Sequence, residues 1–214
     1  MSLLDRLRRL DSCAVSDALD ALGLKGATTG IRALWPAPGV VVGRARTIRV
    51  APRDASMPGV HIATEVIETS VTDDVIVIDN RGSLDVSCWG GILTVAALAK
   101  GVTGVIIDGA CRDIAESEEH GLPVFGRAVV PVSARGRIVQ AAMDEPVRID
   151  VALVRSEDFV IADRSGVVFV HPNEAERVIT LAEKIAARET EMIAALHAGK
   201  SVVDVMHDSQ FPSG

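Results

Sequence analysis

Hydrophobic residues recur with two different periodicities along this chain, and the change from one to the other predicts the order of helices and strands. At residues 12–22 apolar positions recur every three or four residues, which predicts an amphipathic helix with Ser12 as its cap. At residues 40–51 polar and apolar side chains alternate, as is typical of a strand with one exposed face. Residues 75–79, VIVID, form an uninterrupted apolar run that suits a strand covered on both faces.

The densest pattern lies at residues 89–116, which read WGGILTVAALAKGVTGVIIDGACRDIAE. An apolar helix begins at the glycine pair 90–91, and a short buried strand at 105–107 follows it. Arg112 and Asp113 come just after that strand. Because ligands in α/β proteins collect at the carboxyl ends of strands, we expect the chemistry of the protein here.

The remainder of the chain is mostly short strands and one long helix. A hairpin turn is expected at residues 163–166, and the final helix at residues 172–198 begins with a proline. The order of elements predicts a layered α/β fold, with helices packed outside a mixed central sheet. We expect one domain over residues 1–214.

The amino-acid composition argues against some classes of function. The chain of 214 residues has a net charge of −7, only 3% aromatic residues and no tyrosine, which argues against nucleic acid and anionic membranes as partners. No apolar run approaches the roughly 20 residues of a membrane-spanning helix, so a cytoplasmic protein is expected. The cysteines, Cys13, Cys88 and Cys111, lack paired spacing and are expected to be small buried hydrophobes in a reducing compartment.

Three groups in the central stretch carry chemistry. The glycine pair 90–91 at a helix start leaves backbone N–H groups open to an anion, although a tight turn explains two glycines equally well. Arg112 offers a planar fork for a carboxylate. Asp113 and Glu116 are three apart and share a helical face, which suits Mg²⁺ or Mn²⁺, the alternative being a surface charge pair.

The final helix has one charged residue at a position where its apolar stripe predicts a hydrophobic one. Glu189 lies on the helical face of an apolar stripe, and a buried charge needs a partner, a metal or water. We therefore expect it at an interface or a metal site, unless the stripe ends before it. The stripe consists of Val178, Leu181, Ile185, Met192 and Leu196.

Several stretches together resemble one family. VSDALDALG, GVTGVIIDGACRD, DFVIADRSGVVFV and ARETEMIAALHAGKS occur in the order found in the family of the regulator of ribonuclease activity A and the class II 4-hydroxy-4-methyl-2-oxoglutarate/4-carboxy-4-hydroxy-2-oxoadipate aldolases. That family shares an arginine–aspartate pair with an acid three residues later, preceded by a marked residue with twenty residues between. Here Gly91, Arg112, Asp113 and Glu116 have that spacing.

The resemblance implies an αββα sandwich with a mixed central sheet, similar to the swivelling phosphohistidine-like domain. It also implies a homotrimer, or a hexamer made of two trimers. The aldolases of the family are lyases that depend on Mg²⁺ or Mn²⁺, release pyruvate from 4-hydroxy-2-oxo acids and decarboxylate oxaloacetate. We therefore expect a small 2-oxo acid as the substrate.

Roles carried over by position are also expectations. Arg112 is expected to bind the pyruvyl carboxylate or keto oxygen and to stabilise the enolate. Asp113 is expected to ligate the metal, with Glu116 as part of its surroundings. Glu189 is expected to come from a neighbouring subunit and to act through water. The substrate carboxylate is expected at the backbone of Gly90, Gly91, Ile92 and Leu93.

One position departs from the aldolase pattern. Aldolase members carry an aspartate, which holds metal-bound water, where this chain has Gly91, and the ribonuclease-regulator branch also has glycine there. The lead hypothesis is a metal-dependent carbon–carbon lyase. The departure favours the alternative, a non-catalytic regulator that binds and inhibits a ribonuclease; a third hypothesis is a lyase for another hydroxy or sugar acid. The distal half of a substrate is expected to be read by loops such as residues 53–61.

Overall fold

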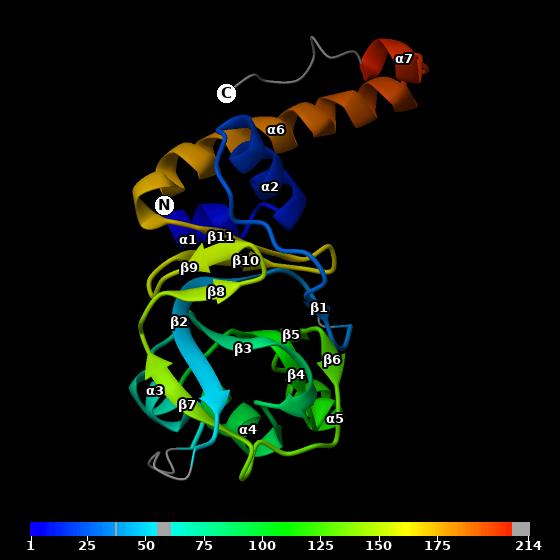
Figure 1. The fold of residues 1–214 in the computed structure, drawn as a ribbon. Helices are drawn as coiled ribbons and strands as arrows, with labels where there is room; N and C mark the ends of the chain where they lie inside the picture. Colours follow the sequence, from blue (N-terminus) through cyan, green and yellow to red (C-terminus); the bar gives the residue numbers. More distant parts are fainter. Residues whose placement is uncertain (37, 55–60, 207–214) are drawn as a thin grey trace.

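Parallel strands form the centre of the fold, and they come from the apolar runs between the helices. A computed structural model describes residues 1–36, 38–54 and 61–206 (Figure 1). The helices are α1 (Leu3–Leu7), α2 (Ser12–Ala21), α3 (Thr64–Thr69), α4 (Gly91–Ala99), α5 (Ile114–His120), α6 (Pro172–His197) and α7 (Val202–Val205). The strands are β1 (Arg32–Ala33), β2 (Val41–Pro52), β3 (Asp74–Ser87), β4 (Gly104–Cys111), β5 (Val124–Gly126), β6 (Ala128–Val129), β7 (Ile138–Met143), β8 (Val147–Ile149), β9 (Ala152–Val154), β10 (Phe159–Ala162) and β11 (Val167–Val170).

The main sheet is mixed and nearly closed. Its order is β1-β5-β4-β3-β2-β10-β11, with β6 added beside β4 and β7 beside β2. Strands β2 to β5 run parallel, whereas β1, β7, β10 and β11 pair antiparallel with their neighbours. All eight residues of β4 are buried, as the continuous apolar run requires for a strand with both faces covered.

Alternate residues of the strands enter different apolar cores, because successive side chains point to opposite faces of a sheet. Ile76 and Ile107 pack in the core beneath α3, α4 and α5, while their neighbours Val77 and Ile106 pack in the core between the sheet halves. A third core joins α1, α2 and α6 to β10 and β11. In Figure 1 the layers therefore run from helices through two strand layers to helices, which confirms the predicted α/β fold with a mixed central sheet.

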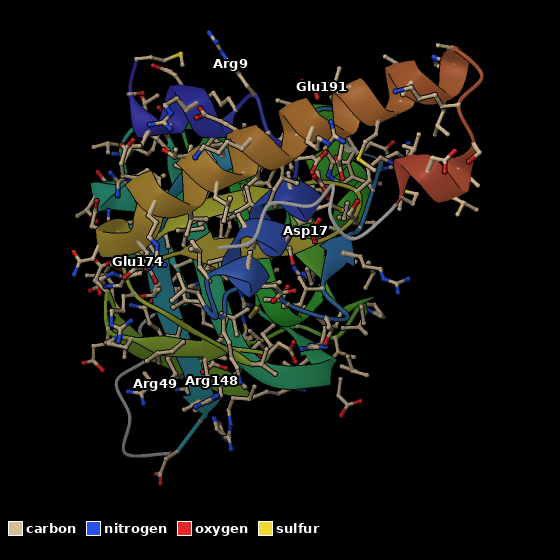
Figure 2. The ribbon with its side chains drawn as sticks, turned by 90° about the horizontal axis from the view of Figure 1, so that it is seen from above. Arg9, Asp17, Arg49, Arg148, Glu174 and Glu191 are labelled. Carbon is tan, nitrogen blue, oxygen red and sulfur yellow. The ribbon has the colours of Figure 1, made fainter. Side chains whose placement is uncertain are left out.

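The final helix is confirmed almost to the residue, but only part of it is packed. Val178 and Ile185 are buried against α2 and the sheet, in line with the predicted stripe. The C-terminal part of the helix projects past the body of the molecule, and α7 lies beside its end (Figures 1 and 2). Ile193 is 55% exposed and Leu196 37% exposed on this projecting part.

The helix at the start of the chain has a different cap from the one expected. Asp11, not Ser12, caps α2, since its carboxylate accepts the N–H of Ala14. Ser12 instead donates its hydroxyl to Asp163 at 2.7 Å, which ties α2 to the hairpin turn between β10 and β11. That turn lies at residues 163–166, as predicted.

Candidate functional site

A cavity of about 350 Å³ opens at the carboxyl ends of β3 and β4. Its near wall is the turn into α4, from Trp89 to Leu93, together with Arg112 and Asp113. Its far wall comes from the end of β2 and from the loop before β7. The cavity therefore lies where the position of Arg112 predicts the chemistry to be.

An irregularity in β3 brings the near wall together. The register between β3 and β4 shifts twice, so that Ser83 pairs with Gly109 and Ser87 with Ala110. After the second shift the N–H of Arg112 donates to the carbonyl of Trp89 at 3.0 Å. The two turns that carry the functional residues are thus held backbone to backbone.

The amino terminus of α4 faces the cavity without a side-chain cap. Gly90 is the N-cap and offers no capping oxygen, so the first amides of α4 and the positive end of its dipole are available to an anion. The N–H of Gly91 donates to Asp113 Oδ2 at 3.1 Å. Within the described residues, no acceptor is found for the amides of Ile92 and Leu93. These two amides are therefore available to an anion.

Two carboxylates lie against the glycine pair. A Cβ on Gly90 would come within 2.7 Å of Asp113 Oδ2 and 3.3 Å of Arg112 Nε. A Cβ on Gly91 would overlap the carboxylate of Glu116. A side chain at position 91 would therefore require the Glu116 carboxylate to move to another rotamer.

Asp113 has an uncommon backbone conformation. Its φ is +56°, in the left-handed region, which aspartate tolerates better than most residues. It occupies the N-cap position of α5 but makes no capping hydrogen bond there. Its Oδ2 accepts from Gly91 N–H and from Arg112 Nε at 3.1 Å instead. Such strained residues concentrate at functional sites, and this one turns its carboxylate toward the cavity.

A buried hydrogen-bond chain, which sequence reasoning missed, fixes the two helices of the site to each other. Trp89 Nε1 donates to the hydroxyl of Thr94, and that hydroxyl lies 3.0 Å from the hydroxyl of Ser117. Thr94 and Ser117 are both 0% exposed. The one signal in the sequence was a single polar residue on the inner face of each helix. This series of buried hydrogen bonds sets the position of Glu116 relative to Gly91.

Two cysteines lie beside the site as neutral thiols. Cys88 and Cys111 are buried, and burial raises the pKa of the Cys111 thiol to about 12 and that of Cys88 as well. They agree with the prediction of small buried hydrophobes, whereas that prediction is wrong for Cys13, which is exposed on α2. Thiolate chemistry at neutral pH is therefore disfavoured in the cavity.

The carboxylates of Asp113 and Glu116 are a donor set that fits Mg²⁺ or Mn²⁺. Mg²⁺ is usually held in proteins by one or two carboxylates and keeps several waters. No cluster of three or more histidine, cysteine or acidic residues suited to a metal occurs in the described part of the chain. A metal at this site would therefore rest on these two carboxylates, with the remaining ligands from water, substrate or another subunit.

The structure brings most of the predicted site residues together. Gly90, Gly91, Ile92, Leu93, Arg112 and Asp113 line the cavity, and Glu116 lies against Gly91. Glu189 is exposed on the projecting part of α6 and does not line the cavity of its own chain. Its buried neighbour Met192 shows that the apolar stripe continues past it, but Glu189 itself is not buried in a single chain.

The far wall contains residues that the sequence indicated only in part. Arg53 and His61 line it, as expected for a rim formed by residues 53–61, although residues 55–60 of that loop lie outside the described part of the chain. Arg135 also lines it and was not anticipated, because nothing in its local sequence distinguishes it from other surface arginines.

Over the residues described, no helix is both long and apolar enough to cross a membrane.

Comparison with known proteins agrees with this geometry. The chain is 30% identical over 208 residues to protein DlpA of Legionella pneumophila, covering 97% of this chain but only 34% of DlpA, so it spans about a third of that relative. It is 29% identical over 128 residues to the 4-hydroxy-4-methyl-2-oxoglutarate aldolase of Thermus thermophilus, covering 60% of this chain and 74% of that protein.

Solved structures share the whole fold. An uncharacterised protein from Pseudomonas syringae superposes with a TM-score of 0.86 at 31% identity, over 96% of both chains. RraAS2 of Streptomyces coelicolor, described as an unusual member of the RNase ES inhibitor RraA protein family, superposes with a TM-score of 0.81 at 26% identity, over 91% of this chain and 97% of that one. The family model described as RraA-like, Aldolase/RraA, matches residues 12–169. The chain therefore belongs to the RraA-like family.

Proposed function

We propose that the protein is a divalent-metal-dependent carbon–carbon lyase that releases pyruvate from a 4-hydroxy-2-oxo acid or from oxaloacetate. The observation that carries this proposal is the convergence of an uncapped helix N-terminus, one guanidinium and two carboxylates on the pair Gly90–Gly91. An aldolase name among the relatives supports the same reaction class.

Different groups of the protein bind the carboxylate and the keto oxygen of the substrate. The free amides of Ile92 and Leu93 bind the substrate carboxylate at the positive end of α4. Arg112 lies beside them and donates to the keto oxygen. As the bond between C3 and C4 breaks, its electron pair moves into the enolate of pyruvate, and the guanidinium stabilises the negative charge on that oxygen. C4 leaves as the carbonyl carbon of the second product, its hydroxyl proton passing to water, or as CO₂ when the substrate is oxaloacetate. A proton then returns to C3 to give pyruvate.

Asp113 and Glu116 are the residues proposed to hold Mg²⁺ or Mn²⁺. When bound, such a metal supplies Lewis-acid polarisation of a substrate oxygen. Glu116 also places a carboxylate where the aldolases have the side chain of residue 91. We therefore infer that the absence of an aspartate at position 91 is compatible with catalysis.

A coupled assay tests the proposal. Pyruvate release from oxaloacetate and from 4-hydroxy-4-methyl-2-oxoglutarate is followed with lactate dehydrogenase and NADH, with Mg²⁺ and then with EDTA. A blank with Mg²⁺ and no protein corrects for spontaneous decarboxylation. Release that EDTA abolishes is the expected result. The proposal fails if no EDTA-sensitive release is seen with either substrate.

We also propose a homotrimer or a hexamer in which Glu189 serves the site of a neighbouring subunit. The support is that Glu189 lies on the projecting part of α6, beside apolar side chains such as Ile193 that are exposed in a single chain. Sedimentation equilibrium tests the assembly, and a monomer would contradict it. Mixing Arg112→Ala subunits with Glu189→Gln subunits tests the sharing, since mixed trimers should regain activity that neither variant has alone.

A second candidate function is supported by a specific observation. Gly91 matches the ribonuclease-regulator branch, and RraAS2 shares the fold. In this alternative the protein binds and inhibits a ribonuclease without chemistry of its own. Inhibition of a purified RNase E-type enzyme that survives Arg112→Ala, together with the absence of pyruvate release, would favour the regulator over the lyase.

A further inference from the structure

The far wall of the cavity carries two arginines, Arg53 and Arg135, in addition to Arg112 on the near wall. We propose that Arg53 and Arg135 form a second anion subsite, which binds the distal carboxylate of a dicarboxylic 2-oxo acid. This inference rests on the proposed function, because it assigns the residues that bind the second carboxylate of its substrate.

The backbone places these two arginines together. β2 pairs antiparallel with β7, ending with Pro52 opposite Ile138, and the N–H of Arg53 then donates to the carbonyl of Arg137 at 2.8 Å. Arg135 is only two residues before Arg137, whose carbonyl accepts the N–H of Arg53. Both therefore belong to one continuous wall, although they are far apart in the sequence.

The turn that carries Arg135 is ordered by its own hydrogen bonds. The N–H of Arg135 donates to the hydroxyl of Ser133 at 3.0 Å, and the N–H of Arg137 donates to the carbonyl of Ala134 at 2.9 Å. Gly136 has a φ of +77°, which lets the chain reverse there. Arg135 is thus presented at the tip of a defined turn.

Neither guanidinium on this wall is neutralised by an acid. In the described part of the chain, the side chains of Arg53 and Arg135 have no hydrogen bond or ion pair, whereas Arg112 is paired with Asp113. Three arginines and a single acid, Asp113, line the cavity among the described residues. A chain of net charge −7 therefore maintains a positively charged cavity, which favours a substrate with more than one negative group.

Part of the cavity lining is apolar. Ile62, Leu93 and Ile138 line the cavity along with its charged groups. A ligand that suits this arrangement has a carboxylate at each end and a short hydrocarbon segment between them. The near wall would then bind the 2-oxo acid end of the ligand, and the far wall would bind its second carboxylate.

A matched pair of ligands tests the subsite by binding alone. 2-Oxoglutarate and 2-oxopentanoate have five carbons each and differ only in a terminal carboxylate or methyl group. In isothermal titration with MgCl₂, the wild type should bind 2-oxoglutarate about tenfold more tightly, the effect of one charge-assisted hydrogen bond. Arg53→Ala and Arg135→Ala should each remove most of this preference and leave the affinity for 2-oxopentanoate unchanged.

Arg148→Ala is the matched control, because Arg148 is an exposed residue of β8 that does not line the cavity and its loss removes the same charge (Figure 2). Equal affinities of the wild type for the two ligands, or equal effects of Arg135→Ala and Arg148→Ala, would overturn the subsite. Failure of the wild type to bind either ligand would overturn it too.

The two proposals fail separately. A diacid preference that depends on Arg53 and Arg135, in a protein that releases no pyruvate, would retain the subsite and reject the lyase. Pyruvate release by a wild type whose diacid preference survives both substitutions would retain the lyase and reject the subsite. Thermal melts of both variants confirm folding, and little change is expected because both side chains are exposed.

Discussion

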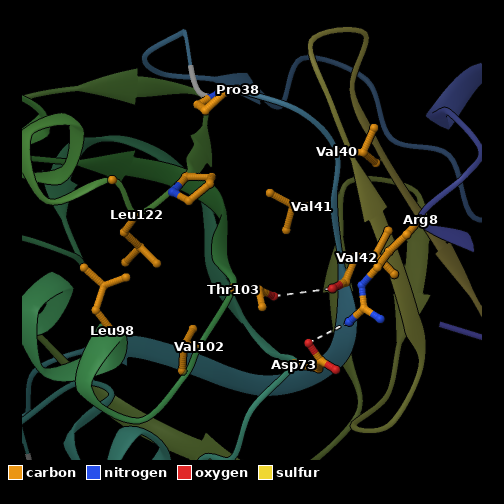
Figure 3. Close-up of a pocket in the computed structure, with 12 residues that line it drawn as sticks. Arg8, Pro38, Val40, Val41, Val42, Asp73, Leu98, Val102, Thr103 and Leu122 are labelled. Carbon is orange, nitrogen blue, oxygen red and sulfur yellow. Dashed lines mark hydrogen bonds and ion pairs between the residues drawn. The ribbon is translucent and has the colours of Figure 1, made fainter. Parts of the chain in front are cut away.

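Two cavities of nearly equal size lie at opposite ends of the parallel strands. The one at the carboxyl ends measures about 350 Å³ and the one at the amino ends about 360 Å³. The amino-end cavity has a floor of valines and leucines, including Val41, Val102 and Leu122 (Figure 3). Its arginine, Arg8, is paired with Asp73 at 2.7 Å. The carboxyl-end cavity, in contrast, has two arginines without a partner among the described residues.

Helix α4 explains much of the contrast, because it reaches both cavities. Its first turn, at Gly91, lines the carboxyl-end cavity, and Leu98 near its other end lines the amino-end cavity. The positive end of the helix dipole therefore points toward one cavity and the negative end toward the other. Volume alone does not distinguish a site; the unpaired charges and the direction of the helix do.

The largest expected effect comes from removing the arginine of each cavity in turn. Arg112→Ala should lower kcat/KM for pyruvate release about 10²- to 10³-fold, as expected for loss of a donor to a developing oxyanion. Arg8→Ala should leave kcat/KM unchanged, since Arg8 lies in the other cavity. The lactate-dehydrogenase-coupled assay measures both. Equal losses in the two variants would remove the functional distinction between the cavities.

A glycine in each cavity gives the next comparison. Gly91→Ala places a methyl group on the Glu116 carboxylate and should weaken Mn²⁺ binding about 10- to 100-fold, measured by electron paramagnetic resonance. Gly121→Ala has no contact within 4 Å but keeps a φ of +80°, so it should cost about 1 kcal/mol of stability and leave Mn²⁺ binding intact. Unchanged Mn²⁺ affinity in Gly91→Ala would contradict the assignment of Glu116 to the metal.

Threonine hydroxyls near the two cavities, one buried and one half-buried, should differ in their contribution to stability. Thr94→Val leaves Trp89 Nε1 and the hydroxyl of Ser117 without a buried partner and should cost about 1–3 kcal/mol. Thr103→Val loses only long contacts, 3.3 Å to the carbonyl of Asp74 and 3.5 Å to that of Val42, and should cost less than about 1 kcal/mol. Urea unfolding measures both, and the reverse order would show that the buried chain does not fix α4 to α5.

The smallest expected effect concerns the thiols. Cys111 has its pKa raised to about 12 by burial, so it stays protonated from pH 7 to pH 9, and the reactive thiolate does not form in that range. Exposed Cys13 should therefore react with Ellman's reagent in the native protein, and all three thiols should react in guanidinium. Rapid labelling of Cys88 or Cys111 at pH 8 would show that the base of the carboxyl-end cavity opens.

Local features of the sequence were sufficient to predict the near wall of the site. The glycine pair before α4, the buried strand before Arg112 and the three-residue spacing of Asp113 and Glu116 are all set within one stretch of chain. α4 begins at Gly91, as predicted, whereas β4 continues to Cys111, four residues beyond the strand predicted at 105–107. The contact between Gly91 and Glu116 needed the structure, because it depends on how two helices pack.

Features that depend on distant pairing could not be predicted. Arg135 reaches the cavity because β7 pairs with β2 across a register shift between Arg49 and Val50, and no local pattern specifies that shift. The capping prediction at α2 was wrong for a related reason. Ser12 is a good cap by type, but a distant carboxylate, that of Asp163, takes its hydroxyl, while Asp11 caps the helix.

The contact between Gly91 and Glu116 also constrains how the sequence can evolve. A side chain at position 91 would overlap the Glu116 carboxylate in its present rotamer, so the two positions are coupled. An aspartate can enter at position 91 only if the flexible side chain of Glu116 turns away. The rotamer of the acid at position 116, more than its identity, should therefore differ between branches of the family that carry glycine and branches that carry aspartate at position 91.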